Sequence, residues 1–158
     1  MRRLTGVGAA LVVVALAMAA ALPAASSQRG QDHTIRVIEV QTEADSLDLG
    51  HRGPSLGDEF VFHSDLRTDG ESVGHDGGTC TVTSLEEGSM GELQCVVTLW
   101  FEEGQITAQG LIQPSETSPE QFEVAITGGT GIYVGAAGQI TVLPRTERRS
   151  RLTISVVT

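Results

Sequence analysis

The feature that most constrains the fold of this chain is a period-two alternation of apolar and polar side chains. In HTIRVIEVQ, residues 33–41, one strand face would carry Ile35, Val37 and Glu39. The other face would carry Arg36, Ile38 and Val40. Successive side chains of a β-strand point to opposite faces, so this spacing predicts a strand, whereas a helix would show the longer period of a helical turn. Seven more segments rich in β-branched or aromatic residues follow, at 58–66, 79–85, 93–101, 105–112, 120–127, 138–143 and 151–158.

Turn-forming residues separate these segments, and the pattern indicates no amphipathic helix between them. Glycine ends the turns at 68–70, 86–88 and 102–104, and prolines precede the sixth segment. Closely spaced strands of this kind predict an all-β sandwich or barrel. We predict an all-β fold, an eight-stranded antiparallel up-and-down β-barrel of lipocalin-like form, because closure removes both exposed edges. The longest predicted loop, 42–57, is expected to cover one mouth of the barrel.

The N-terminus has the pattern of a secretory signal peptide. Two arginines precede an almost wholly apolar run over 4–22, and small residues follow as far as Ser27. A basic start, an apolar run and a small-residue exit are typical of a segment that is removed on export. We predict a signal peptide over 1–26, a barrel domain over 27–158, and a secreted protein that has no membrane contact after cleavage. The alternative is a retained membrane anchor, because the apolar run approaches the length of a spanning helix.

The composition excludes several kinds of chemistry. The formal net charge is −10 at pH 7, so the surface repels nucleic acid and anionic lipid, and no nucleic-acid partner is expected. All ten basic residues are arginine, which excludes a lysine nucleophile or Schiff base. The chain has no asparagine and therefore no acceptor for an Asn-linked glycan. The joint absence of lysine and asparagine, whose codons all begin with AA, is typical of a GC-rich bacterial gene.

The two cysteines are placed symmetrically about a predicted hairpin turn at 87–88. Pairing Thr81 with Gln94, and continuing in the same register to the turn, sets Cys80 directly opposite Cys95. Opposed residues of antiparallel strands lie within disulfide reach. In an exported protein we therefore predict a cross-strand disulfide, which would stabilise the fold by roughly 3 kcal/mol. Two separate thiols are the alternative.

A glycine-rich stretch at 125–140, AITGGTGIYVGAAGQI, raises the question of a phosphate-binding loop. A P-loop requires a lysine, and a dinucleotide-binding fingerprint requires a third glycine at fixed spacing and a helix after it. The stretch meets neither requirement, and too few residues follow it to complete a nucleotide-binding half-domain. We predict instead a tight turn in which a strand bends over one end of the barrel, where close backbone approach requires residues without Cβ.

The same stretch resembles the signature of the allene oxide cyclase barrel family and, more distantly, the Gly-Gly-Thr-Gly segment of plant dirigent proteins. Three further segments carry the resemblance: SLGDEFVFHSDL, GGTCTVTS and GQITAQGLI. It extends over about residues 34–157, nearly the whole predicted mature chain. The resemblance implies an eight-stranded antiparallel barrel, commonly a homotrimer, whose apolar lumen holds a small hydrophobic molecule without a cofactor.

The resemblance also implies a mode of action, because members of this family work by positioning their substrates. Plant cyclases hold a fatty-acid-derived allene oxide in place for ring closure, and dirigent proteins steer the coupling of phenolic intermediates. Related bacterial barrels close rings in polyketide pathways. Such positioning can lower an activation barrier by several kcal/mol without a strong acid or nucleophile.

Individual residues match the family's lumen to different degrees. Glu39 stands where the plant cyclases have a glutamate, on an apolar strand face. We predict that it is a lumen carboxyl with a raised pKa that acts as acid, base or charge stabiliser; a solvent-facing side chain is the alternative. Gln41 and Ser64 replace lumen asparagines. Ile112 replaces a lumen tyrosine, which removes a polar anchor and argues against allene oxide cyclase activity itself.

Other polar clusters predict no further site. His63 and Asp65 share a strand face, but no second cluster at ligand spacing accompanies them, so no metal site is expected. His75 and Asp76 stand beside two glycines, and we interpret them as a solvated turn. The basic segment TERRSR, residues 146–151, is interpreted as an exposed hairpin turn.

Three hypotheses follow for the function. The first is a barrel whose lumen, with Val37 and Cys80 in its wall, binds a small hydrophobic molecule and guides its cyclisation or stereoselective coupling as a cofactor-free isomerase. The second is a non-catalytic carrier of a lipophilic ligand on the same fold. The third is a structural secreted barrel filled by its own side chains, because eight strands enclose either a filled core or room for one ligand.

Overall fold

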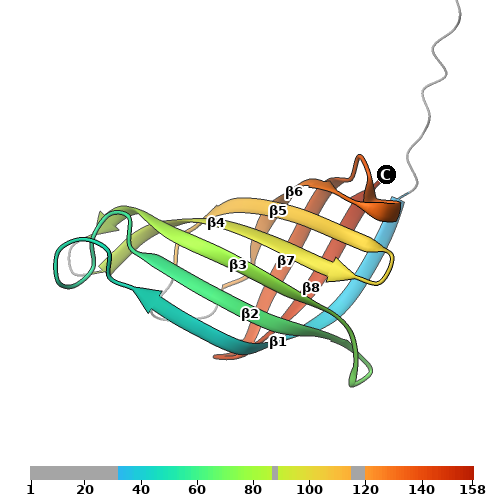
Figure 1. The fold of residues 1–158 in the computed structure, drawn as a ribbon, viewed down its shortest axis with the longest axis horizontal. Helices are drawn as coiled ribbons and strands as arrows, with labels where there is room; N and C mark the ends of the chain where they lie inside the picture. Colours follow the sequence, from blue (N-terminus) through green and yellow to red (C-terminus); the bar gives the residue numbers. More distant parts are fainter. Residues whose placement is uncertain (1–31, 87–88, 115–119) are drawn as a thin grey trace, which may run out of the picture.

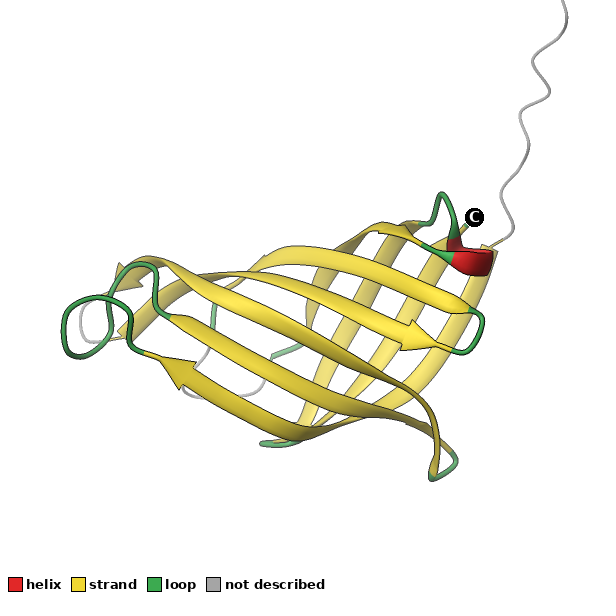
Figure 2. Ribbon diagram, viewed as in Figure 1, coloured by secondary structure: helices red, strands yellow, loops and turns green. Residues whose placement is uncertain are grey.

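The computed structural model describes residues 32–86, 89–114 and 120–158, which form a closed β-barrel (Figures 1 and 2). Every strand pairs antiparallel with its neighbours in sequence, and β8 returns to pair with β1. The strands are β1 (Asp32–Leu47), β2 (Glu59–Thr68), β3 (Glu71–Glu86), β4 (Ser89–Phe101), β5 (Gly104–Ile112), β6 (Phe122–Gly129), β7 (Ala137–Thr146) and β8 (Arg149–Val157), with a 3-10 helix, η1 (Gly131–Tyr133), between β6 and β7. The predicted eight-stranded up-and-down barrel is confirmed. The predicted signal peptide, 1–26, lies outside the described residues.

β1 closes the barrel because it pairs with the last strand, β8, as well as with β2. Its first part pairs with β8, and its second part pairs with β2. The register with β2 shifts between Gln41 and Glu43, where a bulge bends the strand. At this bend the Gln41 N–H donates a hydrogen bond of 3.0 Å to the Arg148 carbonyl oxygen, which ties β1 to the hairpin between β7 and β8.

The loop after β1 is shorter than the sequence predicted, because residues 42–47 continue the strand. Asp58 organises this loop: its carboxylate accepts hydrogen bonds from the Leu49 N–H at 3.0 Å and from the Ser55 N–H at 2.7 Å and hydroxyl at 2.8 Å. These hydrogen bonds from Ser55 lower the pKa of Asp58. No residue of the loop lines the central cavity described below, so the expected cover over a mouth is not formed by it.

The hydrophobic core fills the end of the barrel where η1 lies. Leu66, Ile106 and Ile154 are fully buried there, and the Phe101 ring packs against Tyr133 of η1 with 6.1 Å between ring centroids. Apolar side chains from seven strands and from η1 meet at this end. In the described residues η1 is the only helix, and it is far too short to cross a membrane.

The glycine-rich stretch forms the predicted tight turn at this end. The Thr130 N–H donates to the Gln105 carbonyl at 2.8 Å, and the Gln105 N–H donates back to the Thr130 hydroxyl at 3.0 Å. The Ile132 N–H donates to the Glu103 carbonyl at 3.1 Å. The turn therefore lies directly on the hairpin between β4 and β5, as Figure 2 shows for the helix in red.

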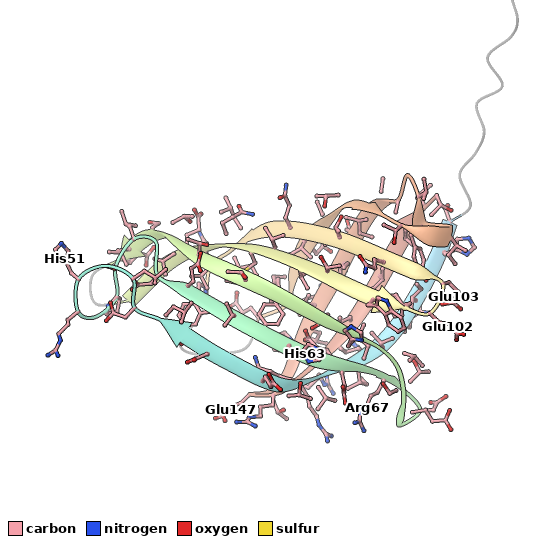
Figure 3. The ribbon with its side chains drawn as sticks, viewed as in Figure 1. His51, His63, Arg67, Glu102, Glu103 and Glu147 are labelled. Atoms are coloured by element: carbon pink, nitrogen blue, oxygen red, sulfur yellow. A yellow bond between two sulfur atoms is a disulfide. The ribbon has the colours of Figure 1, made fainter. Side chains whose placement is uncertain are left out.

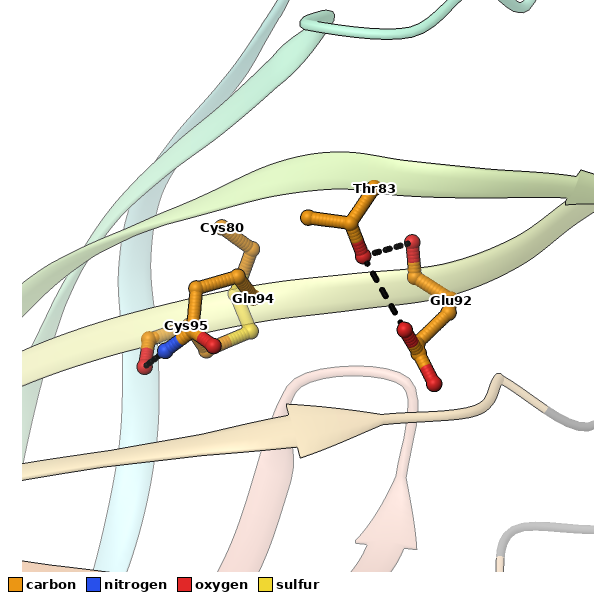
Figure 4. Close-up of a disulfide and its surroundings, with 5 residues drawn as sticks. All are labelled: Cys80, Thr83, Glu92, Gln94 and Cys95. Atoms are coloured by element: carbon orange, nitrogen blue, oxygen red, sulfur yellow. Dashed lines mark hydrogen bonds between the residues drawn. A yellow bond between two sulfur atoms is a disulfide. The ribbon is translucent and has the colours of Figure 1, made fainter.

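The hairpin between β3 and β4 carries a disulfide between Cys80 and Cys95, which are directly opposite in the register (Figure 4). The predicted pairing of Thr81 with Gln94 is confirmed. Two register shifts around Ser84 interrupt the pairing nearer the turn. The turn at 87–88 lies outside the described residues.

Substituting Gly131 with alanine tests the close approach of the turn to the hairpin. Gly131 has a φ of 63°, and a Cβ there would overlap the Glu103 carbonyl oxygen. Gly135 has a φ of 81° but open space around it. We expect Gly135→Ala to lower the free energy of unfolding by about 1 kcal/mol and Gly131→Ala by about 3 kcal/mol or more, measured by urea unfolding. Equal losses would mean that backbone conformation, rather than contact with the hairpin, is the constraint.

Candidate active site in the barrel lumen

The barrel contains a cavity of about 230 Å³ in the part of its interior that the core does not fill. Apolar side chains and the disulfide form most of its wall: Phe62, Cys80, Cys95, Val97, Ile112, Phe122, Val124 and Val142. Residues 147–150 of the hairpin between β7 and β8 line its mouth. The third hypothesis, a lumen filled by its own side chains, does not fit a cavity of this size.

The lumen brings together most of the residues that the sequence nominated. Glu39, Gln41, Ser64 and Ile112 all line the cavity, together with the two bridged cysteines. Val37 also faces the barrel interior, but it is buried in the hydrophobic core and does not line this cavity. The family resemblance therefore nominated residues that share one cavity, while the division of the interior into core and cavity separated Val37 from the rest.

Glu39 is the ionisable group on the cavity wall that is most strongly affected by burial. It lies on β1 opposite Ser150 of β8. Burial raises the pKa of the Glu39 carboxyl, and polar contacts with Ser150 and Asp76 offset part of this rise. A carboxyl in such surroundings takes up and releases a proton closer to neutral pH than one in water.

Asp76 interacts with Glu39 but does not line the cavity, and the sequence interpretation missed it. It is 1% exposed, and neither of its carboxyl oxygens has a hydrogen-bond partner. On β3 it stands opposite Ser64 of β2, whose hydroxyl is equally buried and also without a partner. Burial, and then the nearby charge of Glu39, raise the pKa of Asp76 to about 8.

The interpretation of His75 and Asp76 as a solvated turn is wrong. β3 begins at Glu71, so both residues lie inside a strand. Asp76 is in phase with Cys80 along this strand, and this two-residue spacing is the signal that places it on the inner face. The adjacent glycines suggested a turn because glycine is common in turns, but here Gly78 shares the inner face with Asp76 and leaves room for the Phe62 ring to pack against the strand.

The exposed histidines do not contribute to the lumen. His63 and Asp65 face the outside of the barrel, where His63 stacks on His75 with 5.5 Å between ring centroids. His75 in turn stacks on Trp100 at 5.0 Å. Asp65 pairs with Arg67 at 2.8 Å. Among residues 32–86, 89–114 and 120–158, no group of three His, Cys, Asp or Glu side chains is arranged to hold a metal ion.

The protonation of the two carboxyls is coupled. Burial raises the pKa of both groups, and the Glu39 charge adds to the rise at Asp76, whose pKa of about 8 keeps it protonated at neutral pH. When Glu39 ionises, the pair offers a carboxylate, which accepts a proton or stabilises positive charge, beside a carboxylic acid, which donates a hydrogen bond. Two carboxyls whose surroundings separate their protonation states are a common acid–base arrangement in active sites.

Comparison with known proteins identifies the family. A model of the allene oxide cyclase barrel like domain matches residues 36–157. The chain belongs to this family. The resemblance stated from sequence motifs is therefore confirmed, as is the barrel that it implied. No curated protein gave a significant match.

Solved structures share the barrel. A pyocyanin demethylase is 29% identical, with a TM-score of 0.67, and the match covers 78% of this chain and 99% of that chain. An exo-specific intermolecular Diels-Alderase, AbnU, is 16% identical, with a TM-score of 0.65 and coverage of 82% and 100%. A pterocarpan synthase dirigent protein is 19% identical, with a TM-score of 0.59 and coverage of 82% and 90%. The last two show similarity of fold alone.

Replacing Asp76 with asparagine tests its protonation. The pKa of Asp76 is about 8 in the folded protein and about 4 in an unfolded chain. The folded state therefore binds one proton more between these values, and the native protein loses stability as the pH rises through this window. We expect the free energy of unfolding of Asp76→Asn, relative to the native protein, to increase from about pH 5 to about pH 8, by at most on the order of 1 kcal/mol per pH unit.

Urea unfolding at several pH values measures this difference, and Asp69→Asn, at an exposed turn, provides the comparison. The same trend in Asp69→Asn would show that the pH dependence does not arise from Asp76. If the free energies of unfolding of Asp76→Asn and the native protein differ by the same amount at every pH, Asp76 does not hold a proton at neutral pH.

Proposed function

We propose that this barrel binds one compact hydrophobic molecule in its lumen and guides its cyclisation or stereoselective coupling without a cofactor. The observation that carries the proposal is the cavity itself: about 230 Å³, apolar over most of its wall, with the Glu39 carboxyl on its wall and the buried Asp76 interacting with Glu39 outside the lining. Membership of the allene oxide cyclase barrel family and the barrel fold shared with a Diels-Alderase and a dirigent protein support it.

Catalysis in this proposal combines confinement with one charged group. A narrow cavity holds a flexible substrate in the conformation that precedes bond formation, which reduces the entropic part of the barrier. The Glu39 carboxylate removes a proton or stabilises positive charge that develops on the substrate, and the mostly apolar wall strengthens this interaction. The protonated Asp76 carboxyl holds the Glu39 carboxyl in position, and the Gln41 amide orients a polar group of the substrate.

The proposal includes export and assembly. The apolar N-terminal segment and the disulfide between Cys80 and Cys95 support export to an oxidising compartment. We propose that signal cleavage releases the barrel and that it assembles as a homotrimer.

A second candidate function is demethylation of a pyocyanin-like compound. The pyocyanin demethylase is more similar in sequence to this chain than the other two structures described above, at 29% identity. A non-catalytic carrier is the remaining alternative, because Ile112 stands where the family's cyclases have a tyrosine and the lumen has few polar groups.

Glu39→Gln separates these functions, because it removes the charge and keeps the shape of the side chain. The native protein, Glu39→Gln and the outer-face control Glu123→Gln are incubated with a lipophilic extract of the producing cells and, separately, with pyocyanin. Native mass spectrometry detects bound molecules, and chromatography detects products. We expect Glu39→Gln to bind the same ligand as the native protein and to lose its conversion by about 100-fold or more, with Glu123→Gln unaffected.

The form of the product distinguishes the candidates. An isomer of the bound molecule, with unchanged mass, supports cyclisation, whereas loss of one methyl group from pyocyanin supports demethylation. A ligand that is bound and released unchanged by the native protein would establish a carrier. Undiminished conversion by Glu39→Gln would contradict the role proposed for the carboxylate.

A further inference from the structure

The mouth of the lumen is formed by the most basic segment of an acidic chain. Residues 145–151 hold four arginines and one glutamate, whereas the whole chain has a formal net charge of −10. Arg148 and Arg149 line the cavity mouth, together with Glu147. Figure 3 labels Glu147 beside β1. The sequence interpretation of this segment as an exposed turn is therefore incomplete, because the turn borders the lumen.

The backbone of this hairpin is fixed in relation to the polar side of the lumen. The Arg148 carbonyl accepts the hydrogen bond of 3.0 Å from Gln41 N–H, at the bend in β1. Arg149 stands opposite Val40, and the next residue, Ser150, stands opposite Glu39. Because neighbouring strand residues alternate in direction, Ser150 faces the lumen, whereas Arg149 leaves β8 on its outer side at the rim of the cavity, next to Arg148 in the turn.

Both guanidinium groups are free of carboxylate partners within the described part of the chain. The one ion pair found there joins Arg67 to Asp65 on the outer surface of the barrel. Arg148 and Arg149 are exposed, and neither forms an ion pair with the adjacent Glu147. A guanidinium presents several N–H donors in one plane, which suits two-point binding of a carboxylate or a similar planar anion.

We propose that Arg148 and Arg149 form an anion-binding subsite that selects compact ring-bearing acids, whose ring system lies in the lumen and whose acidic group stays at the mouth. The inference rests on the proposed function, since it specifies the class of molecule that the lumen accepts. Phe62 and Phe122 provide aromatic walls for the rings. The volume of about 230 Å³ is smaller than that of pockets for drug-sized ligands, which begin near roughly 300 Å³.

The charges along the lumen also set the direction of binding. The Glu39 carboxylate lies inside and repels an acidic group that enters first, whereas the two arginines outside attract it. Glu147 reduces the attraction at the mouth, but it contributes one negative charge against two positive ones. The same arrangement presents the opposite end of the ligand to Glu39. The subsite thereby orients the molecule for the reaction.

Three naphthalenes of similar size test this inference: 1-naphthoate, 1-naphthylmethanol and 1-naphthylmethylammonium. Calorimetry measures their affinity for the native protein and for Arg148→Gln/Arg149→Gln. Arg145→Gln/Arg151→Gln is the matched control, because it removes the same charge from the same segment at positions that do not line the cavity. We expect the native protein to bind naphthoate most tightly, and the first double variant to lose about tenfold or more of this affinity.

The neutral alcohol is expected to bind all three proteins within about twofold, and added salt is expected to weaken only naphthoate. Naphthoate binding that is no tighter than that of the alcohol, or an equal loss by both ligands in Arg148→Gln/Arg149→Gln, would overturn the subsite and leave the lumen proposal standing. Binding by none of the three compounds would overturn both. Circular dichroism verifies that each variant is folded.

A second pair of variants locates the binding. Val97→Phe narrows the lumen, whereas Val96→Phe adds the same group on the outer face of the same strand. We expect Val97→Phe alone to weaken the three naphthalenes together. An effect of Val96→Phe equal to that of Val97→Phe would place the ligand outside the barrel and overturn the inference.

Discussion

Closure of the sheet by pairing of β1 with β8 is the constraint on which the rest of this structure depends. An open sheet of these strands would expose two edges and could not enclose a lumen. Closure requires β1 to pair with two different strands, and the bulge after Gln41 provides the bend between them. The same bend brings Gln41 against the Arg148 carbonyl. The geometry that closes the barrel therefore also fixes the side of the lumen where Glu39, Ser150 and the basic hairpin meet.

The interior is divided by the size of the side chains that face it. Bulky aliphatic residues and the pair of Phe101 and Tyr133 fill the end below η1. Toward the other end, glycines occupy inward positions: a Cβ at Gly78 would collide with the Phe62 ring, and one at Gly110 would collide with Val124. Without a Cβ at these two positions, the side chains of Phe62 and Val124 pack against the strand backbone and leave the centre of the barrel unfilled. An unfilled cavity lowers the stability of a fold, and the packed core at the η1 end offsets this loss.

The electrostatics of the lumen follow from its low polarity. Burial, and then the nearby charge of Glu39, raise the pKa of Asp76 to about 8, so this carboxyl keeps its proton at neutral pH. Glu39 lines the cavity, and burial raises its pKa as well. The arginines of the hairpin between β7 and β8 place positive charge at the mouth, next to the part of β1 that carries Glu39. The charge distribution therefore orients a bound molecule, in addition to the selection by the shape of the cavity.

The sequence alone determined the eight-stranded barrel and the pairing of the two cysteines, because period-two alternation and turn residues are local signals. Glu39 could be assigned to the interior by its strand face, whereas Gln41, Ser64 and Ile112 were assigned there from the family resemblance. Only the tertiary structure decided which inward positions line a cavity and which pack in the core, and so separated Val37 from Glu39. It also revealed Asp76, because adjacent glycines made a strand resemble a turn, and it placed the basic hairpin at the lumen mouth. These features depend on contacts between strands far apart in sequence, which a local pattern does not specify.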